Sequence, residues 1–132
     1  PGKVVFTVDF RSPDLAVITD MEERLKIGAK EICDEMGLGI EFEKVGGFDP
    51  VEFDHDCVKA IRDAADRLGY SHRDIISGAG HDACYIARVA PTAMVFVPCE
   101  NGISHNEAEN ADPKHLEAGC NVLLQAVLQQ AE

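Results

Sequence analysis

The chain has 132 residues, of which 45% are hydrophobic. This length corresponds to about one globular domain with a buried core, and the hydrophobic content argues against a disordered chain. Lys and Arg total 12 against 24 Asp and Glu, which gives a formal net charge of -12. Because a field of that sign repels nucleic acids and anionic membranes, we expect neither as a partner, whereas divalent cations are tolerated or attracted.

The five cysteines are odd in number, and no two of them form a Cys-x-x-Cys pair. This argues against a disulfide framework and against a structural zinc site, and it predicts a reducing, cytoplasmic compartment. No apolar run approaches the roughly 20 residues that span a bilayer, and the first residues do not resemble a leader peptide. We therefore expect neither a membrane span nor a leader.

The first part of the chain predicts a strand, a long helix and a second strand. Residues 4–8 are β-branched and aromatic, which is typical of a strand. Ser12 is the expected N-cap of the helix, with Pro13 at its first position. Apolar residues then follow at steps of three and four up to Met36, before Gly37 ends the helix. Residues 40–42 alternate like a half-buried strand.

A glycine-rich stretch at residues 46–50 is the best candidate for a domain boundary. After it, Asp54 is the expected cap of a helix that ends at Gly69. Residues 75–76 predict a short buried strand. A tight loop follows at residues 77–80, and a helix is expected from residue 81 to 88.

The last part of the chain begins with residues 93–97, which predict a central strand because they are apolar throughout. A polar loop covers residues 98–111, and Asp112 with Pro113 opens a final helix. This alternation predicts an α/β layer sandwich. In such folds, sites gather in loops beyond the carboxyl ends of strands, and residues 77–82 and 98–109 are two loops of this kind, each with a histidine.

The loop of residues 77–83 has the sequence Ser-Gly-Ala-Gly-His-Asp-Ala. Its glycines, Gly80 among them, let the backbone approach a ligand closely, and His81 is placed to donate a hydrogen bond to negative charge developing on a substrate carbonyl. Asp82 is a candidate for orienting an imidazole. The alternative is a simple strand-to-helix turn in which Asp82 caps the helix, and the spacing favours neither.

In the second loop, His105 is a candidate metal ligand, since a neutral imidazole binds zinc and similar ions well. Glu109 is a candidate to hold the other ring nitrogen of His105. The alternative is a solvated acidic loop with an incidental histidine. A catalytic zinc needs about three protein ligands, and the chain offers no second or third ligand at helical or strand spacing.

Arg11 follows directly on the first predicted strand. A guanidinium at that place can bind a carboxylate through two parallel hydrogen bonds. The alternative is an ordinary ion pair with Asp9 or Asp14, and the residues alone favour the ion pair.

Taken together, these motifs resemble a known family. Residues 77–83, 94–98 and 101–106 resemble the carboxyl-terminal part of the N-carbamoyl-L-amino-acid hydrolases. These enzymes stand with allantoate amidohydrolase and β-ureidopropionase in a superfamily of dinuclear metallo-amidohydrolases and aminopeptidases. Residues 8–14 resemble the Asp-Ile-Arg-Ser motif of that family's lid, or dimerisation, domain. The resemblance covers nearly the whole chain.

The resemblance implies a role for each motif. His105 corresponds to the last metal ligand, Gly80 and His81 to residues that contact the substrate, and Arg11 to the residue that holds the substrate carboxylate. It further implies two divalent metal ions per site (zinc, manganese or cobalt) and hydrolysis of the C–N bond of a carbamoyl or ureido acid by metal-activated water. His81 then stabilises the tetrahedral oxyanion.

The chain departs from the family pattern in one respect. The family's other metal ligands and its general base lie in an amino-terminal half that has no counterpart here. We therefore expect residues 1–48 to be part of the lid and residues 49–132 to be the carboxyl-terminal part of the catalytic domain. The parent enzyme is expected to be a homodimer through its lid, and this chain alone is expected to be inactive. Two alternatives remain open, a non-catalytic dimerisation or binding module and a metallo-aminopeptidase.

Overall fold

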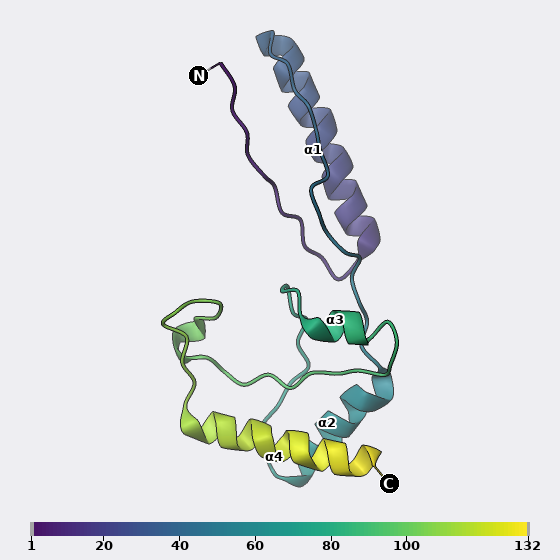
Figure 1. The fold of residues 1–132 in the computed structure, drawn as a ribbon, viewed down its shortest axis with the longest axis vertical. Helices are drawn as coiled ribbons and strands as arrows, with labels where there is room; N and C mark the ends of the chain where they lie inside the picture. The colour runs from purple at the N-terminus through teal and green to yellow at the C-terminus, as the bar shows by residue number, and fades with distance from the viewer. Residues whose placement is uncertain (1, 132) are drawn as a thin grey trace. The chain divides into compact units, whose positions relative to one another are not determined.

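The computed structural model describes residues 2–131 (Figure 1). Its elements are the helices α1 (Leu15–Met36), α2 (His55–Arg67), α3 (Asp82–Ile86) and α4 (Pro113–Gln130), and a short 3-10 helix, η1 (Glu100–Gly102). The chain divides into two units, Pro1–Val51 and Glu52–Glu132. The division falls just after the boundary expected near residue 48. The assignment of the two units to a lid and a catalytic domain stays a prediction.

Helix α1 dominates the first unit. Its N-cap is Asp14, whose carboxylate accepts a hydrogen bond from the backbone N–H of Ala16 at 2.8 Å. The prediction of Ser12 as the cap is wrong, because the Ser12 hydroxyl accepts the N–H of Asp14 at 3.2 Å and so belongs to the turn before the helix. The predicted end is confirmed, since Gly37 adopts a left-handed conformation with φ 67°.

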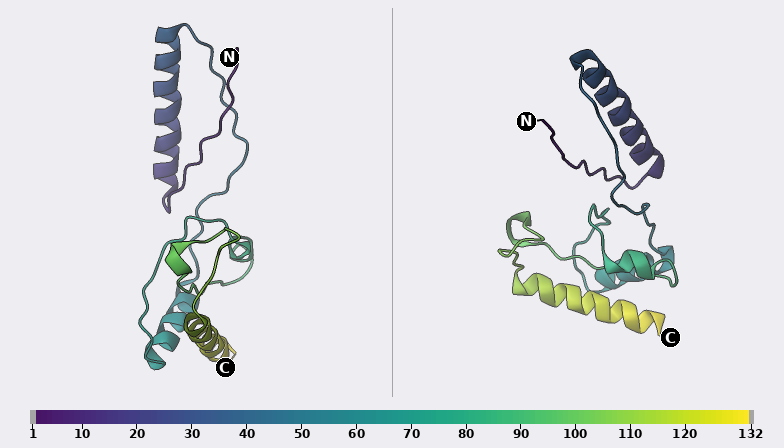
Figure 2. Two further views of the ribbon diagram at one scale, coloured as in Figure 1. Left: turned by 90° about the vertical axis from the view of Figure 1, so that its left-hand side faces the viewer. Right: turned by 45° about the horizontal axis from the view of Figure 1, so that its top comes forward.

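The segments on either side of α1 run back along the helix, as Figures 1 and 2 show. Within residues 2–131, neither these segments nor any other is a β-strand. The strands predicted at residues 4–8, 40–42, 75–76 and 93–97 are therefore not formed here. A strand exists only when its backbone N–H and C=O groups pair with a neighbouring strand, and none of the described segments supplies such a ladder. The helices of the expected α/β sandwich are present, but its sheet is not.

The predicted apolar face of α1 is not buried within the described residues. The helix has no buried residue; on that face Ile32 and Met36 are more than half exposed, whereas Ile18 and Leu25 are half-buried. Phe6, in the segment before the helix, is 74% exposed. The helix has the predicted apolar spacing, and the described residues of this unit cover that face only in part.

The second unit is held together by the packing of α2 against α4. Five buried residues form its core, and all but one are alanines: Ala60, Ala64, Ala65, Val122 and Ala126. Small side chains let two helix backbones approach closely. At the edge of this contact, the amide of Asn121 donates to the hydroxyl of Tyr70 at 3.3 Å, and Arg67 donates to Gln129 at 3.1 Å.

The predicted starts of both packed helices are confirmed. Asp54 accepts the N–H of Cys57 at 2.8 Å, and Asp112 accepts the N–H of Lys114 at 2.8 Å. The large apolar residues of α4, including Leu123, do not form its buried face, because they are about half exposed. The alanine-rich stripe of α2 contacts the neighbouring stripe of α4, where Val122 lies. No helix in the described part of the chain is long and apolar enough to cross a membrane.

Candidate active-site loops

The segment of residues 93–97 joins helix α4 to the loop that carries His81. On one side, a Cβ atom placed on Gly119 would lie 2.5 Å from Cγ1 of Val97 and 4.0 Å from Cγ1 of Val95. On the other side, the ring of Phe96 lies against the imidazole of His81, with centroids 5.5 Å apart and an interplanar angle of 61°. Alternate side chains thus point to opposite sides, as in an extended strand. This alternation fixes where the His81 loop lies relative to α4.

The imidazole of His81 is held by a hydrogen bond within its own loop. Its Nε2 lies 2.8 Å from the hydroxyl oxygen of Ser77, and that oxygen also accepts the N–H of Ala79 at 3.2 Å. A hydroxyl has one proton and two lone pairs, so the Ser77 oxygen can accept the Ala79 N–H and still pair with Nε2 in either tautomer of the imidazole. His81 is half-buried. The ring is therefore oriented by Ser77 and Phe96 together.

The loop turns into α3 directly after His81. The N-cap position is His81 itself, and its side chain makes no capping hydrogen bond. The alternative in which Asp82 caps the helix is wrong, because Asp82 is already the first helical residue. Both Gly80 and Asp82 are exposed. A histidine side chain that is not needed to cap the helix remains available for other contacts.

The second candidate loop is closed at its base by Glu100 and Asn110. The N–H of Glu100 donates to the carbonyl of Asn110 at 2.7 Å, and the amide of Asn110 donates to the carboxylate of Glu100 at 3.0 Å. Three residues inside the loop have left-handed backbones: Asn101 (φ 54°), Gly102 (φ 68°) and His105 (φ 55°). Only one of them is a glycine, so the loop holds two side chains in a region that L-residues seldom adopt.

Glu109 contacts His105 through the backbone. Its carboxylate accepts the N–H of His105 at 2.8 Å, and its other oxygen lies 3.8 Å from the thiol of Cys99. The pairing of the two residues was expected, but the group contacted is the main-chain amide. The expected contact between Glu109 and the imidazole ring stays a prediction.

Arg11 lies in the first unit and forms an ion pair with Asp9. Its Nε lies 2.9 Å from the Asp9 carboxylate, and Nη2 contacts the same oxygen. Hydrogen bonding to Arg11 lowers the pKa of Asp9. Both side chains are more than half exposed, so the pair is a surface ion pair of small energetic value. This contact is the one that the residues alone favoured.

The metal-binding residues of a complete site are not assembled here. Among residues 2–131 no group of three or more His, Cys, Asp or Glu side chains is placed to hold a metal ion. The described residues therefore do not by themselves fit a metal ion, although His105 is of the type that serves as one ligand.

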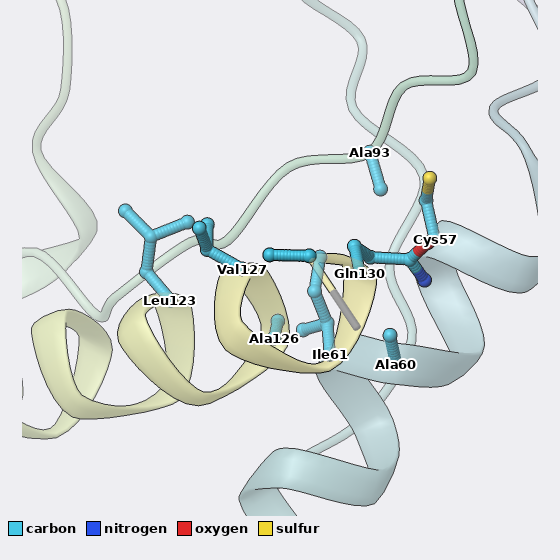
Figure 3. A pocket seen from close by; sticks show the side chains of 9 residues that line it. Cys57, Ala60, Ile61, Ala93, Leu123, Ala126, Val127 and Gln130 are labelled. Carbon is cyan, nitrogen blue, oxygen red and sulfur yellow. The ribbon is translucent and has the colours of Figure 1, made fainter.

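An apolar pocket lies elsewhere in the second unit, between α2, α4 and Ala93 (Figure 3). It has a volume of about 380 Å³ and is lined mainly by apolar side chains, among them Ile61, Leu123 and Val127. None of the predicted site residues lines it. Apolar spacing along the sequence points to this pocket in part, since Leu123 and Val127 follow one another at four-residue spacing in α4.

Comparison with known proteins resolves the family. The model of the peptidase family M20/M25/M40 matches residues 4–129. The chain belongs to this family. It is 54% identical, over its entire length, to an N-carbamoyl-L-amino-acid amidohydrolase of Rhizobium meliloti. It is 38% identical over 131 residues to the allantoate amidohydrolase of Escherichia coli (strain K12). The family recognised from the loop motifs is confirmed.

The fold of this chain matches that of a solved structure. An amidase of the hydantoinase/carbamoylase family from Burkholderia multivorans superposes on 91% of the chain with a TM-score of 0.87 and 56% sequence identity. The match covers 29% of that protein. The chain likewise spans 32% of the length of the Rhizobium and Escherichia relatives. The fold is therefore that of one part of these amidases.

Proposed function

We propose that this chain is the carboxyl-terminal part of a divalent-metal-dependent amidohydrolase that hydrolyses the C–N bond of N-carbamoyl amino acids or related ureido acids. The observation that carries the proposal is the 54% identity, over all 132 residues, to a protein named N-carbamoyl-L-amino-acid amidohydrolase. The two candidate loops supply the proposed chemistry, because each carries a histidine with a defined hydrogen bond. His81 pairs with Ser77, and the backbone of His105 pairs with Glu109.

His81 is proposed to act on the substrate carbonyl. A hydrogen-bond donor fixed in advance lowers the energy of the oxyanion that develops during attack on an amide or ureido carbon. The hydroxyl of Ser77 on Nε2 and the ring of Phe96 restrict the imidazole, so little reorientation is needed at the moment of reaction. Gly80, next to it, offers an exposed backbone that a substrate can approach.

Arg11 is proposed to bind the substrate carboxylate. A guanidinium already paired with Asp9 must exchange that carboxylate for the carboxylate of the substrate. Since the existing pair is exposed and weak, the exchange is energetically feasible. This role predicts a change in KM rather than in kcat when Arg11 is replaced.

His105 is proposed to be one ligand of a site for two divalent ions, zinc, manganese or cobalt, whose other ligands lie outside these residues. When bound, such ions polarise a carbonyl and lower the pKa of water. Because residues 2–131 hold no three-ligand cluster, the chain by itself is expected to be inactive.

We further propose a homodimer through the first unit, supported by the exposed apolar residues of α1. We also propose a cytoplasmic location, supported by the five free thiols.

A chimaera tests the proposal most directly. These 132 residues would replace the matching third of the Rhizobium meliloti relative, and the product would be assayed with N-carbamoyl amino acids, allantoate and dipeptides. Turnover of a carbamoyl or ureido acid that is lost in His105→Ala is the expected result. A folded chimaera that cleaves only dipeptides would favour the aminopeptidase alternative, and a folded chimaera without turnover would favour a non-catalytic module.

The isolated chain serves as the second arm of the test. It would be incubated with the same substrates and with zinc, manganese or cobalt, beside its own His105→Ala variant. No turnover above that variant is expected. Clear turnover would contradict the view that essential ligands lie elsewhere.

A further inference from the structure

The loop that carries His105 holds this residue in an unusual backbone conformation. His105 has φ 55°, in the left-handed region, and it is one of two residues other than glycine with positive φ among those described. A side chain there crowds the following carbonyl group, so the conformation persists only where neighbouring contacts fix it. The contacts around His105 therefore indicate which residues hold it in this left-handed conformation.

One acidic side chain makes the decisive contact. The carboxylate of Glu109 accepts the backbone N–H of His105 at 2.8 Å. This bond fixes the peptide plane between Ser104 and His105, and φ then sets the direction in which the His105 side chain leaves that plane. A bond from an amide to an ionised carboxylate is stronger than one between neutral groups.

The carboxylate of Glu109 is itself held in place. The thiol of Cys99, which is half-buried, donates to its second oxygen at 3.8 Å. The N–H of Glu109 donates to the carbonyl of Asn106 at 2.9 Å, and the side chain of Asn106 accepts the N–H of Ala108 at 2.9 Å. These contacts turn the chain through residues 106–109, which brings Glu109 back to His105. The left-handed residue and the turn thus support each other.

We infer that Glu109 is a positioning residue, which acts through the backbone of His105 to aim the imidazole rather than by contacting the ring. The inference rests on the proposed function in one respect, namely that the imidazole so aimed serves as a metal ligand. This role differs from a contact with the imidazole ring, because the Glu109 carboxylate accepts the main-chain N–H of His105. Glu107, two positions earlier in the same loop, is exposed and has no such contact.

The test uses the 132-residue chain labelled with ¹⁵N and compares it with Glu109→Gln, Glu109→Ala and the matched control Glu107→Ala. Two NMR readouts are taken for His105: the hydrogen-exchange rate of its amide and the strong intraresidue NOE between amide and Hα protons that marks positive φ. Exchange about tenfold faster, with loss of the NOE, is expected in Glu109→Ala. Glu109→Gln keeps one acceptor oxygen and should retain part of the protection. Glu107→Ala should match the unaltered chain.

Two results would overturn the inference. One is an unchanged His105 amide in Glu109→Ala when far-UV circular dichroism shows the helices intact. The other is an equal effect of Glu107→Ala. If Glu109→Ala loses its helices, Glu109→Gln decides: a partial or full loss of His105 amide protection in that folded variant supports the inference, and protection equal to that of the unaltered chain contradicts it.

The zinc content of a chimaera separates this inference from the proposed function, because the Rhizobium meliloti relative supplies the remaining part of the site. Zinc content would be measured for the unaltered chimaera and for its His105→Ala and Glu109→Ala variants. If His105→Ala keeps the full zinc content while Glu109 protects the His105 amide in the 132-residue chain, the metal role fails and the positioning role stands. If His105→Ala loses zinc and Glu109→Ala does not, the positioning role has no consequence for the ligand and is contradicted.

Discussion

The imidazole of His81 meets the ring of Phe96 edge to face, with centroids 5.5 Å apart. Phe96 lies between two valines, Val95 and Val97, that face Gly119 of helix α4. The extended segment of residues 95–97 therefore contacts α4 on one side and His81 on the other, so a shift of α4 would also move the loop that carries His81. Changes in this segment are expected to affect the candidate site without touching the substrate.

His81→Asn tests the proposed role in stabilising the oxyanion. In the chimaera with the Rhizobium relative, we expect kcat to fall by about 10²- to 10³-fold with a much smaller change in KM, because the interaction is made mainly in the transition state. Steady-state kinetics with an N-carbamoyl amino acid measure both constants. His115→Asn, which replaces an exposed histidine in the first turn of α4, is the control and should leave both unchanged. A tenfold rise in KM alone would assign His81 to ground-state binding.

Gly119→Ala should destabilise the second unit. Alanine favours a helix over glycine by about 1 kcal/mol, but its methyl group would lie 2.5 Å from Cγ1 of Val97, whose χ1 is stiff. Overpacking of this kind costs about 1–3 kcal/mol, so we expect a net loss of about 1 kcal/mol. Urea denaturation measures the free energy of unfolding. Gly28→Ala is the matched control, because it lies inside α1 with no atom within 4 Å, and it should stabilise its helix.

Ala64→Leu should disrupt the contact between α2 and α4. Ala64 is fully buried, with 0% exposure, and the added carbon atoms have no space between the helices. The expected loss is about 1–3 kcal/mol in the free energy of unfolding, measured by urea denaturation. Ala16→Leu, at an exposed position of α1, adds the same atoms in water and should change this free energy little. Equal effects of the two variants would show that α2 and α4 do not pack as described.

The Asp54 cap should make stability depend on pH at the acid end. The N–H of Cys57 lowers the pKa of Asp54 in the folded chain. The ionised carboxylate is therefore favoured by folding, and its contribution is complete above the unfolded pKa of about 3.9 and is lost as pH falls through the lower, folded pKa. Asp54→Asn caps the helix equally well at every pH, so its stability should fall less between pH 5 and pH 2.

Thermal melts monitored by circular dichroism across this pH range provide the comparison. Asp56→Asn removes the same charge from the first turn of α2 without removing the cap, and its acid response should stay close to that of the unaltered chain. If Asp54→Asn and the unaltered chain lose stability in parallel, the carboxylate does not stabilise the helix through its charge.

The sequence by itself determined the features that depend on local chemistry. The caps at Asp54 and Asp112 and the left-handed end at Gly37 followed from residue type, because a side-chain acceptor or a missing Cβ acts within one helical turn. The family followed from the loop motifs, which are short and contiguous. The start of α1 was misplaced because Ser12 and Asp14 are both good caps, and only the actual hydrogen bonds distinguish them.

The tertiary structure decided which faces pack and which groups meet. Periodicity marks the apolar residues of α4, but it does not say that the stripe with Val122 rather than Leu123 meets α2, since that depends on the shape of the opposing helix. Strand propensity at residues 93–97 does not produce a ladder, because pairing requires a second strand brought close by the rest of the fold. In the same way, the sequence predicts that Glu109 lies near His105. Only the turn through residues 106–109 determines that the carboxylate accepts the backbone N–H of His105.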